Sequence, residues 1–283
     1  MTESRNPYHR DDGQRVVRRS VVAIMDILGF AEMAKQAQKH DQEDEFLTRL
    51  YAALEQGRKW LELDKALPKF GEKDFYVLKA FTDNIVIGWP VRDDAESELG
   101  SAFSALAWFQ LEMVNAGFFV RGAISVGNIY VDDIAVFGGA LIEAHEGEAI
   151  LAKDPRIILT ASAAEATQLH LGYYGGGAHA PQNRDLFRDA DGQLFLNYLD
   201  DTVLIAPDEA GPGYDMLDSH KQRVTERLTE HRSNPAIWNK YAWVARYHNY
   251  FCDLWPQYFD KNHKIDVRAF EMMPSQIVDA TGR

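Results

Sequence analysis

The stretch LKAFTDNIVIGW, residues Leu78–Trp89, predicts two β-strands that meet at a tight turn. Apolar residues fill both halves of the stretch, and its Ile and Val residues favour pleated structure. Asp83 and Asn84 interrupt the apolar pattern in the middle, and both residue types are common in tight turns. The sequence therefore predicts a buried hairpin with one carboxylate, that of Asp83, at its tip.

Helical and strand patterns alternate on both sides of this hairpin. The residues VVAIMDI (Val21–Ile27) have the continuous apolar pattern of a buried strand. Further strands are expected over residues 118–127, 156–162 and 194–200, a glycine-rich loop over 172–185, and helices from residue 30 into the forties and over 44–63, 93–115, 138–152, 214–232 and 234–251. This order predicts an α+β fold in which helices pack on one mostly antiparallel sheet.

Composition and charge narrow the class of protein. The chain has 283 residues, 46% of them hydrophobic, which is ample for a packed core. Its formal net charge of −13 disfavours nucleic acid and anionic membranes as partners. The single cysteine, Cys252, excludes an internal disulfide and is expected to be a small buried apolar residue. Since we find neither a secretory signal nor an apolar run of about 20 residues, we expect a cytoplasmic protein.

Two aspartates carry the candidate chemistry. Asp26 ends the strand Val21–Ile27, and Asp83 lies at the hairpin tip, so both carboxylates reach one edge if these elements are sheet neighbours. Two carboxylates held together repel each other unless a cation neutralises them, and Mg²⁺ and Mn²⁺ prefer oxygen ligands. The backbone N–H groups of residues 27–30 would then be suited to bind a triphosphate. The alternative interpretation is two separate turn aspartates that cap local backbone.

Four motifs in a fixed order change the balance between these interpretations. They are MDILGF (Met25–Phe30), KAFTD (Lys79–Asp83), RGAISVG (Arg121–Gly127) and FGGALIEA (Phe137–Ala144). In this order they resemble the motifs of the class III nucleotidyl cyclases, over about residues 21–162. The resemblance implies a cyclase-like fold with a flexible tail over residues 1–20, a catalytic domain over 21–200 and a helical C-terminal extension over 201–283 that packs on the domain or on a dimer partner.

Further details resemble the pyrimidine cyclases of the bacterial Pycsar anti-phage systems. They are the TDN sequence at the hairpin tip, the strand start Pro155–Ile157 and the helix KYAWVARYHN (Lys240–Asn249). This resemblance implies a uridylate cyclase that converts UTP to 3′,5′-cyclic UMP and pyrophosphate, with the product acting on a separate cyclic-nucleotide effector. A cytidylate cyclase that acts on CTP is the alternative, because the sequence does not identify the base.

The resemblance also assigns roles to individual residues. Asp26 and Asp83 would bind two divalent ions, Mn²⁺ or Mg²⁺, and Ile27 would add a backbone carbonyl. The turn residues Ile27, Leu28, Gly29 and Phe30 would bind the triphosphate, and Lys79 would contact the base. The enzyme would work as a head-to-tail homodimer with its active sites at the interface.

Some positions depart from the family pattern. The purine cyclases carry an asparagine and, four residues later, an arginine that steadies the transition state, but Ile142 and Glu146 stand there in this chain. The adenine-pairing aspartate aligns with Ala135, so Arg121 is our candidate for the stabilising positive charge. A catalytically inactive, nucleotide-binding signalling domain is a second hypothesis. A two-metal phosphodiesterase or nuclease is a third, and it would need further ligands.

Overall fold

The structure is a computed structural model, and it describes residues 6–62, 76–81, 84–175, 177, 179–200, 212–267 and 278–279. The strands of these residues are β1 (Arg18–Ile27), β2 (Val77–Phe81), β3 (Asn84–Pro90), β4 (Val120–Val131), β5 (Val136–Phe137), β6 (Ile157–Leu159), β7 (Leu186–Arg188), β8 (Leu194–Leu196) and β9 (Val278–Asp279). The α-helices are α1 (Phe30–Lys39), α2 (Glu43–Glu62), α3 (Glu96–Asn115), α4 (Gly139–Glu146), α5 (Ala161–Leu171), α6 (Gln182–Asp185), α7 (Tyr214–Glu230) and α8 (Pro235–Leu254), and a π-helical turn, η2 (Gly147–Leu151), follows α4. No helix among the described residues is both long and apolar enough to cross a membrane.

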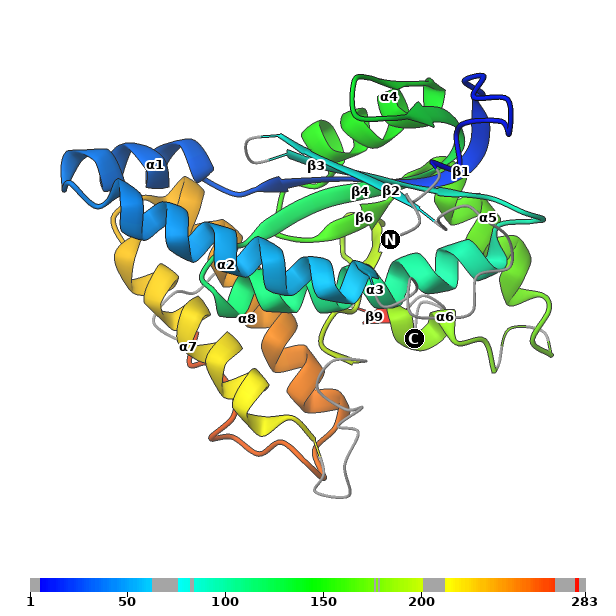
Figure 1. Ribbon diagram of the computed structural model, residues 1–283. Coiled ribbons are helices and arrows are strands. Elements are labelled where there is room, and N and C mark those ends of the chain that lie inside the picture. The colour runs from blue at the N-terminus through cyan, green and yellow to red at the C-terminus, as the bar shows by residue number, and fades with distance from the viewer. Residues whose placement is uncertain are drawn as a thin grey trace.

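One sheet organises the molecule. Its strands run in the order β2-β3-β1-β4-β6-β8-β7-β9, and β5 pairs with β4 outside this path. The β4–β6 pair is parallel, whereas the other pairs of the described strands are antiparallel. Helices α2 and α3 cover one face of the sheet, and α4 covers the other (Figure 1). The predicted α+β fold with a mostly antiparallel sheet is therefore confirmed.

Strand β1 lies in the middle of the sheet, between β3 and β4. Val21, Ala23 and Met25 join the core beneath α2 and α3, whereas Val22 and Ile24 pack with residues of α4. All five side chains are at most 4% exposed. The continuous apolar run in the sequence follows from this position, because a strand covered on both faces needs apolar residues at every position.

The predicted hairpin is present and lies beside β1. Strands β2 and β3 pair in an antiparallel manner, with Phe81 opposite Asn84, and β3 pairs with β1. Thr82 and Asp83, which connect the two strands in the sequence, lie outside the described residues. The hairpin prediction is thus confirmed for its strands, and the position of the Asp83 carboxylate stays a prediction.

Within the flexible tail expected over residues 1–20, the structure describes residues 6–20, and these contact the sheet. Strand β1 already begins at Arg18, and the Tyr8 side chain is fully buried. The Tyr8 and Ser20 hydroxyls are hydrogen-bonded at 2.9 Å. Tyr8 can be buried there because Gly88 has no side chain. A Cβ atom at Gly88 would lie 2.4 Å from the Tyr8 hydroxyl oxygen, too close for both to fit. Sequence patterns alone do not reveal that a polar segment carries one such anchor.

The described part of the C-terminal extension consists mainly of a helical hairpin, α7 and α8, that packs on the sheet and on α3 (Figure 1). The extension is not wholly helical, because Val278–Asp279 add strand β9 to the sheet beside β7. Helix α8 begins as its sequence predicts, with Pro235 in the first turn and the Asn234 side chain accepting the Ile237 N–H at 3.4 Å. Tyr241 of α8 packs edge-on against Phe119, with ring centroids 4.9 Å apart. Cys252 is fully buried, as expected.

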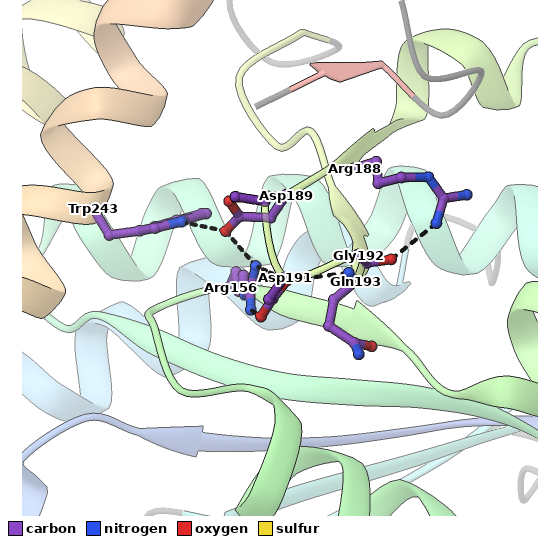
Figure 2. Close-up of polar contacts among 8 residues, drawn as sticks. Arg156, Arg188, Asp189, Asp191, Gly192, Gln193 and Trp243 are labelled. Carbon is purple, nitrogen blue, oxygen red and sulfur yellow. Dashed lines mark hydrogen bonds and ion pairs between the residues drawn. The ribbon is translucent and has the colours of Figure 1, made fainter. Parts of the chain in front are cut away.

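A charged cluster also attaches α8 to the sheet (Figure 2). The Trp243 indole N–H donates to Asp189 Oδ2 at 2.5 Å, and the Arg156 guanidinium pairs with both Asp189 and Asp191. Arg156 precedes β6, and the two aspartates lie in the β7–β8 turn. The cluster therefore joins three separate parts of the chain.

Candidate functional site

Asp26 lies one residue before the end of β1, and its register places it between two other strands. It is opposite Asn84, the first residue of β3, and opposite Arg121, the second residue of β4. Side chains alternate along a strand, so Asp26 shares the α4 face of the sheet with Val22 and Ile24. Its side chain is 17% exposed. The carboxylate therefore sits at the end of the sheet, partly open to solvent.

Arg121 bridges two carboxylates at this end of the sheet. Its Nε donates to Asp26 Oδ2 at 3.1 Å, and its Nη2 lies 3.1 Å from the same oxygen. Nη2 also lies 2.8 Å from Oε1 of Glu148, whose side chain is 6% exposed. The structure thus brings together two residues that the sequence singled out, Asp26 and Arg121. It adds Glu148, which the sequence analysis did not identify.

Glu148 owes its position to the π-helical turn η2. The Ala152 N–H donates to Gly147 O at 2.9 Å, a span of five residues. Gly147 allows this turn to pack closely, because a Cβ atom there would lie 2.8 Å from the Thr160 side chain and 2.9 Å from that of Ala123. Such single π-turns are frequent at functional sites. The sequence signal for Glu148 is weak, since a glutamate after a glycine does not indicate a buried carboxylate.

The turn after β1 brings backbone N–H groups to the same end of the sheet. The Leu28 N–H donates to Phe119 O at 2.8 Å, which fixes the turn against the start of β4. Gly29 precedes α1 and has φ +74°, a left-handed conformation that glycine adopts without strain. The first N–H groups of α1, beginning at Phe30, have no acceptor within the helix and carry the positive end of its dipole. The predicted substrate-binding residues Ile27 to Phe30 are therefore one continuous turn beside Asp26.

Lys79 occupies a different part of the same face. It pairs with Val86 across β2 and β3, and Val86 pairs with Ile24 of β1. Its Nζ donates to Asp133 O at 3.1 Å, in the turn after β4. The structure therefore holds Lys79 against a backbone carbonyl and does not pair it with Asp26. Its predicted role in base contact stays a prediction.

A second lysine, Lys240 of α8, lies close to the Asp26 region. It lines a cavity of about 370 Å³ together with Leu28 and Gly29 of the turn. Burial lowers the pKa of Lys240, the positive charge of Arg121 lowers it further, and Asp154 and Asp26 oppose the shift. Lys240 is thus within electrostatic range of Asp26 and Arg121. It makes no hydrogen bond or ion pair with any residue that the structure describes.

The donor atoms at this end of the sheet suit a hard divalent cation. Asp26 supplies carboxylate oxygens and Ile27 a carbonyl oxygen, and oxygen ligands are what Mg²⁺ and Mn²⁺ prefer. In the part of the chain that the structure describes, no three His, Cys, Asp or Glu side chains converge as metal ligands. The described residues therefore fit part of an Mg²⁺ or Mn²⁺ site, and they offer no further ligands of the kind that the phosphodiesterase or nuclease hypothesis requires.

Comparisons with known proteins found similarity only to solved structures. No family model and no curated protein matches the chain. The crystal structure of the guanylyl cyclase Cya2 is similar at TM-score 0.42 and 13% identity, covering 53% of this chain and 78% of that chain. A class III adenylyl cyclase-like ATP-binding protein from Pseudomonas aeruginosa is similar at TM-score 0.39 and 14% identity, covering 58% of this chain and 39% of that one. At TM-scores below 0.5, these similarities assign neither a family nor an activity to this chain.

Proposed function

We propose that the protein is a metal-dependent nucleotide cyclase that converts UTP to 3′,5′-cyclic UMP and pyrophosphate. The observation that carries the proposal is the strand register at Asp26. Asn84, which follows Asp83 in the chain, is the residue opposite Asp26 on β3. This register supports the expectation that both aspartates serve one site. A cytidylate cyclase that uses the same chemistry on CTP is the closest alternative.

The residues of the chain would divide the work as follows. Asp26 and Asp83, with the Ile27 carbonyl, would hold Mn²⁺ or Mg²⁺, which lowers the pKa of the ribose 3′-hydroxyl and neutralises phosphate charge when bound. The Gly29 and Phe30 N–H groups, at the end of the turn from Ile27 to Phe30, would bind phosphate oxygens, while the Leu28 N–H holds the turn through Phe119 O. Arg121 keeps the Asp26 carboxylate oriented, and its guanidinium would stabilise charge that develops at the α-phosphate.

The reaction needs no covalent enzyme intermediate. The ribose 3′-oxygen forms a bond to the α-phosphorus, and the bond from that phosphorus to the oxygen bridging to the β-phosphate breaks. Pyrophosphate leaves with the electron pair of that bond, and the 3′-hydroxyl proton passes to solvent. Catalysis of this kind consists mostly of positioning and of charge neutralisation. The contacts of Asp26 and Arg121 serve both purposes.

A homodimer is part of the proposal. Three large apolar side chains are exposed around α4 and the turn between β4 and β5: Ile134 at 81%, Phe137 at 67% and Ile142 at 61%. They belong to the elements on the α4 side of the sheet, which is also the Asp26 side. Such exposed apolar groups favour association. Ile142 stands where the purine cyclases carry an asparagine, so the proposed interface would use apolar packing there.

The biological role follows from the resemblance to the Pycsar cyclases. We propose that the cyclic nucleotide is a second messenger in anti-phage defence and that it activates a separate effector protein. The TDN sequence at the hairpin tip, the strand start Pro155–Ile157 and the helix segment Lys240–Asn249 are the features that support this step.

The test is a product screen with each of the four ribonucleoside triphosphates and Mn²⁺, read by mass spectrometry. A cyclic monophosphate from UTP alone is the expected result. A product from CTP alone would keep the mechanism and change the base. No cyclic product from any triphosphate, even with extract of phage-infected cells added, would reject the cyclase.

One observation favours a second candidate, an inactive domain that binds a nucleotide and signals by dimerisation. Arg121 contacts Asp26 through both Nε and Nη2, an arrangement that competes with a metal ion for Oδ2. The exposed Ile142 and Glu146 also replace the transition-state pair of the purine cyclases. Binding of a triphosphate by calorimetry without any turnover would support this candidate.

A further inference from the structure

The cavity beside the turn after β1 lies between four helices. Its lining comes from α1, α2, α7 and α8 and from the turn itself, and its volume is about 370 Å³. Three acidic and three basic side chains line it: Glu32, Glu45, Glu230, Arg49, Arg227 and Lys240. The three acids are exposed, whereas Arg227 and Lys240 are half-buried. Solvent screens exposed charges more strongly, so positive charge prevails on the inner wall.

Two of the three cations are already engaged. Arg227 pairs with Glu230 Oε2 at 2.6 Å and donates to Gly117 O at 2.9 Å. The Arg49 guanidinium lies over an aromatic ring, 5.2 Å from the centre of Phe118. Both arginines therefore have a structural role that accounts for their position.

Lys240 has no such role among the described residues. Its backbone is fixed, because the neighbouring Tyr241 packs on Phe119 and because Trp243, one turn on, is anchored to Asp189. Its ammonium group nevertheless pairs with no described carboxylate or carbonyl. A half-buried ammonium without a hydrogen-bonded partner loses hydration, and the carboxylates of Asp154 and Asp26 offset only part of that loss. Such a position is suited to an anionic ligand.

We infer that Lys240 binds the terminal phosphates of a nucleoside triphosphate whose α-phosphate lies beside Asp26. This inference rests on the proposed function. Three features converge on the cavity: the turn residues Leu28 and Gly29, the positive end of α1 and the Lys240 ammonium. A polyphosphate chain is a class of anion that presents several phosphate groups, so it can engage both the turn beside Asp26 and the Lys240 ammonium. The helical hairpin α7–α8 is then part of the binding site as well as a packing element.

The experiment compares Lys240→Met with a matched control, Lys261→Met, in the full chain. Lys261 is exposed and is not among the residues that line the cavity. The probes are inorganic tripolyphosphate, UTP, CTP and their nucleoside monophosphates, each measured by calorimetry with Mg²⁺. Lys240→Met should weaken tripolyphosphate and triphosphate binding by about 10- to 100-fold, the range of one hydrogen bond to a charged group, and leave monophosphate binding unchanged.

Two controls distinguish a loss of phosphate binding from a loss of folded structure in Lys240→Met. Lys240→Arg should restore at least part of the triphosphate affinity, which a merely structural lysine would not explain. Thermal unfolding should show that Lys240→Met is folded, because methionine keeps the apolar stem and removes a poorly hydrated charge.

The outcomes are decisive in both directions. Tripolyphosphate binding that Lys240→Met leaves unchanged, or that Lys261→Met weakens equally, overturns the inference. A wild-type protein that binds tripolyphosphate in a Lys240-dependent manner but forms no cyclic product keeps the phosphate subsite and rejects the cyclase. A Lys240→Met variant that cyclises the nucleotide with wild-type kcat and KM rejects the subsite and keeps the cyclase.

Discussion

Arg121 is the second residue of β4 and Arg156 immediately precedes the neighbouring strand β6, and the surroundings of the two arginines differ. The Gly122 N–H, next to Arg121, donates to Arg156 O at 3.0 Å. Each guanidinium lies between two carboxylates, Asp26 and Glu148 for Arg121 and Asp189 and Asp191 for Arg156. Arg156 is 1% exposed, whereas Arg121 is 24% exposed.

The difference in exposure distinguishes the Arg156 cluster, which holds parts of the fold together, from the Arg121 cluster, which is open enough to contact a ligand. Around Arg156 the Trp243 indole adds a further donor to Asp189, and the side chains point toward one another in a closed arrangement (Figure 2). Around Arg121 the carboxylate of Asp26 stays partly open, at the end of a strand and beside a helix N-terminus. A fully buried pair of this kind fixes elements to each other, while an open one is available to a ligand.

The largest expected effect is on catalysis, from Asp26→Asn. The amide cannot balance the charge of a divalent ion, so formation of the cyclic product should fall by at least about 1000-fold, or about 4 kcal/mol. Stability should change little, because Arg121 keeps Glu148 as a partner. Product formation and thermal unfolding are measured on the same samples.

The matched control for this change is Asp218→Asn, at an exposed position on α7. It should retain wild-type turnover. Retained turnover in Asp26→Asn would mean that the cluster around Arg121 has only a structural role, as the cluster around Arg156 does.

The second effect is on folding, from Arg156→Met. The change leaves the buried carboxylate of Asp189 without its cation, which costs about 3–5 kcal/mol of unfolding free energy. The Arg188→Met variant removes a neighbouring arginine whose side chain, among the described residues, donates to Gly192 O, and it should cost less than about 0.5 kcal/mol. Urea denaturation of both variants measures the difference, and equal midpoints would contradict the structural role of Arg156.

The third effect is on the pH dependence of folding stability. It comes from a buried histidine pair between helices α7 and α8. His220 and His248 are fully buried, with their Nδ1 atoms 3.0 Å apart. His248 Nε2 donates to His263 O at 2.9 Å, so its Nδ1 is the acceptor for the His220 Nδ1–H, and Tyr198 donates to His220 Nε2 at 2.8 Å. This chain of bonds is complete with both rings neutral.

Burial lowers the pKa of His248 to about 4 and lowers that of His220 as well. Between pH 6.5 and about 4 the unfolded chain therefore binds more protons than the folded one. Stability should be complete above pH 6.5 and fall as the pH is lowered, by about 3 kcal/mol for His248 alone. Urea midpoints from pH 8 to pH 4 test this, and a His248→Gln variant should show a smaller pH dependence. A flat profile would contradict the neutral pair.

The smallest expected effect tests the role of Glu148, the second carboxylate that contacts Arg121. Glu148→Gln keeps the shape of the side chain and removes its charge, so Arg121 should be held less firmly against Asp26. We expect a loss of about tenfold in kcat/KM for cyclic product, or about 1.4 kcal/mol. Glu165→Gln, at an exposed position on α5, is the control. Equal activity of the two variants would assign Glu148 to packing alone.

The sequence predicted the elements whose signals are local. The hairpin strands around Asp83, the apolar strand Val21–Ile27 and the start of α8 at Pro235 follow from residue type and spacing. The expected strand over 156–162 is wrong in extent, because β6 ends at Leu159 and α5 begins at Ala161. Ser162 lies in the first turn of α5, and its hydroxyl accepts the Val126 N–H at 2.9 Å.

The contacts of the candidate site were less predictable. Asp26 and Arg121 are 95 residues apart, and the sequence motifs indicated each of them separately. Nothing local indicates that Glu148 pairs with Arg121, since its burial depends on a π-turn and on close packing at Gly147. Lys240 lies in a helix whose pattern favours core packing, and only the arrangement of α8 beside Gly29 reveals it. Such long-range pairs depend on the register of the sheet.

The most direct test of the central claim is the stoichiometry of the products from UTP, or from CTP if that is the substrate, with Mn²⁺. The account predicts cyclic nucleotide and pyrophosphate in equal amounts, and neither product from the 3′-deoxy triphosphate, which lacks the attacking oxygen. Pyrophosphate released from the 3′-deoxy analogue, or linear monophosphate in place of the cyclic product, would contradict the assignment of the Asp26 site to cyclisation.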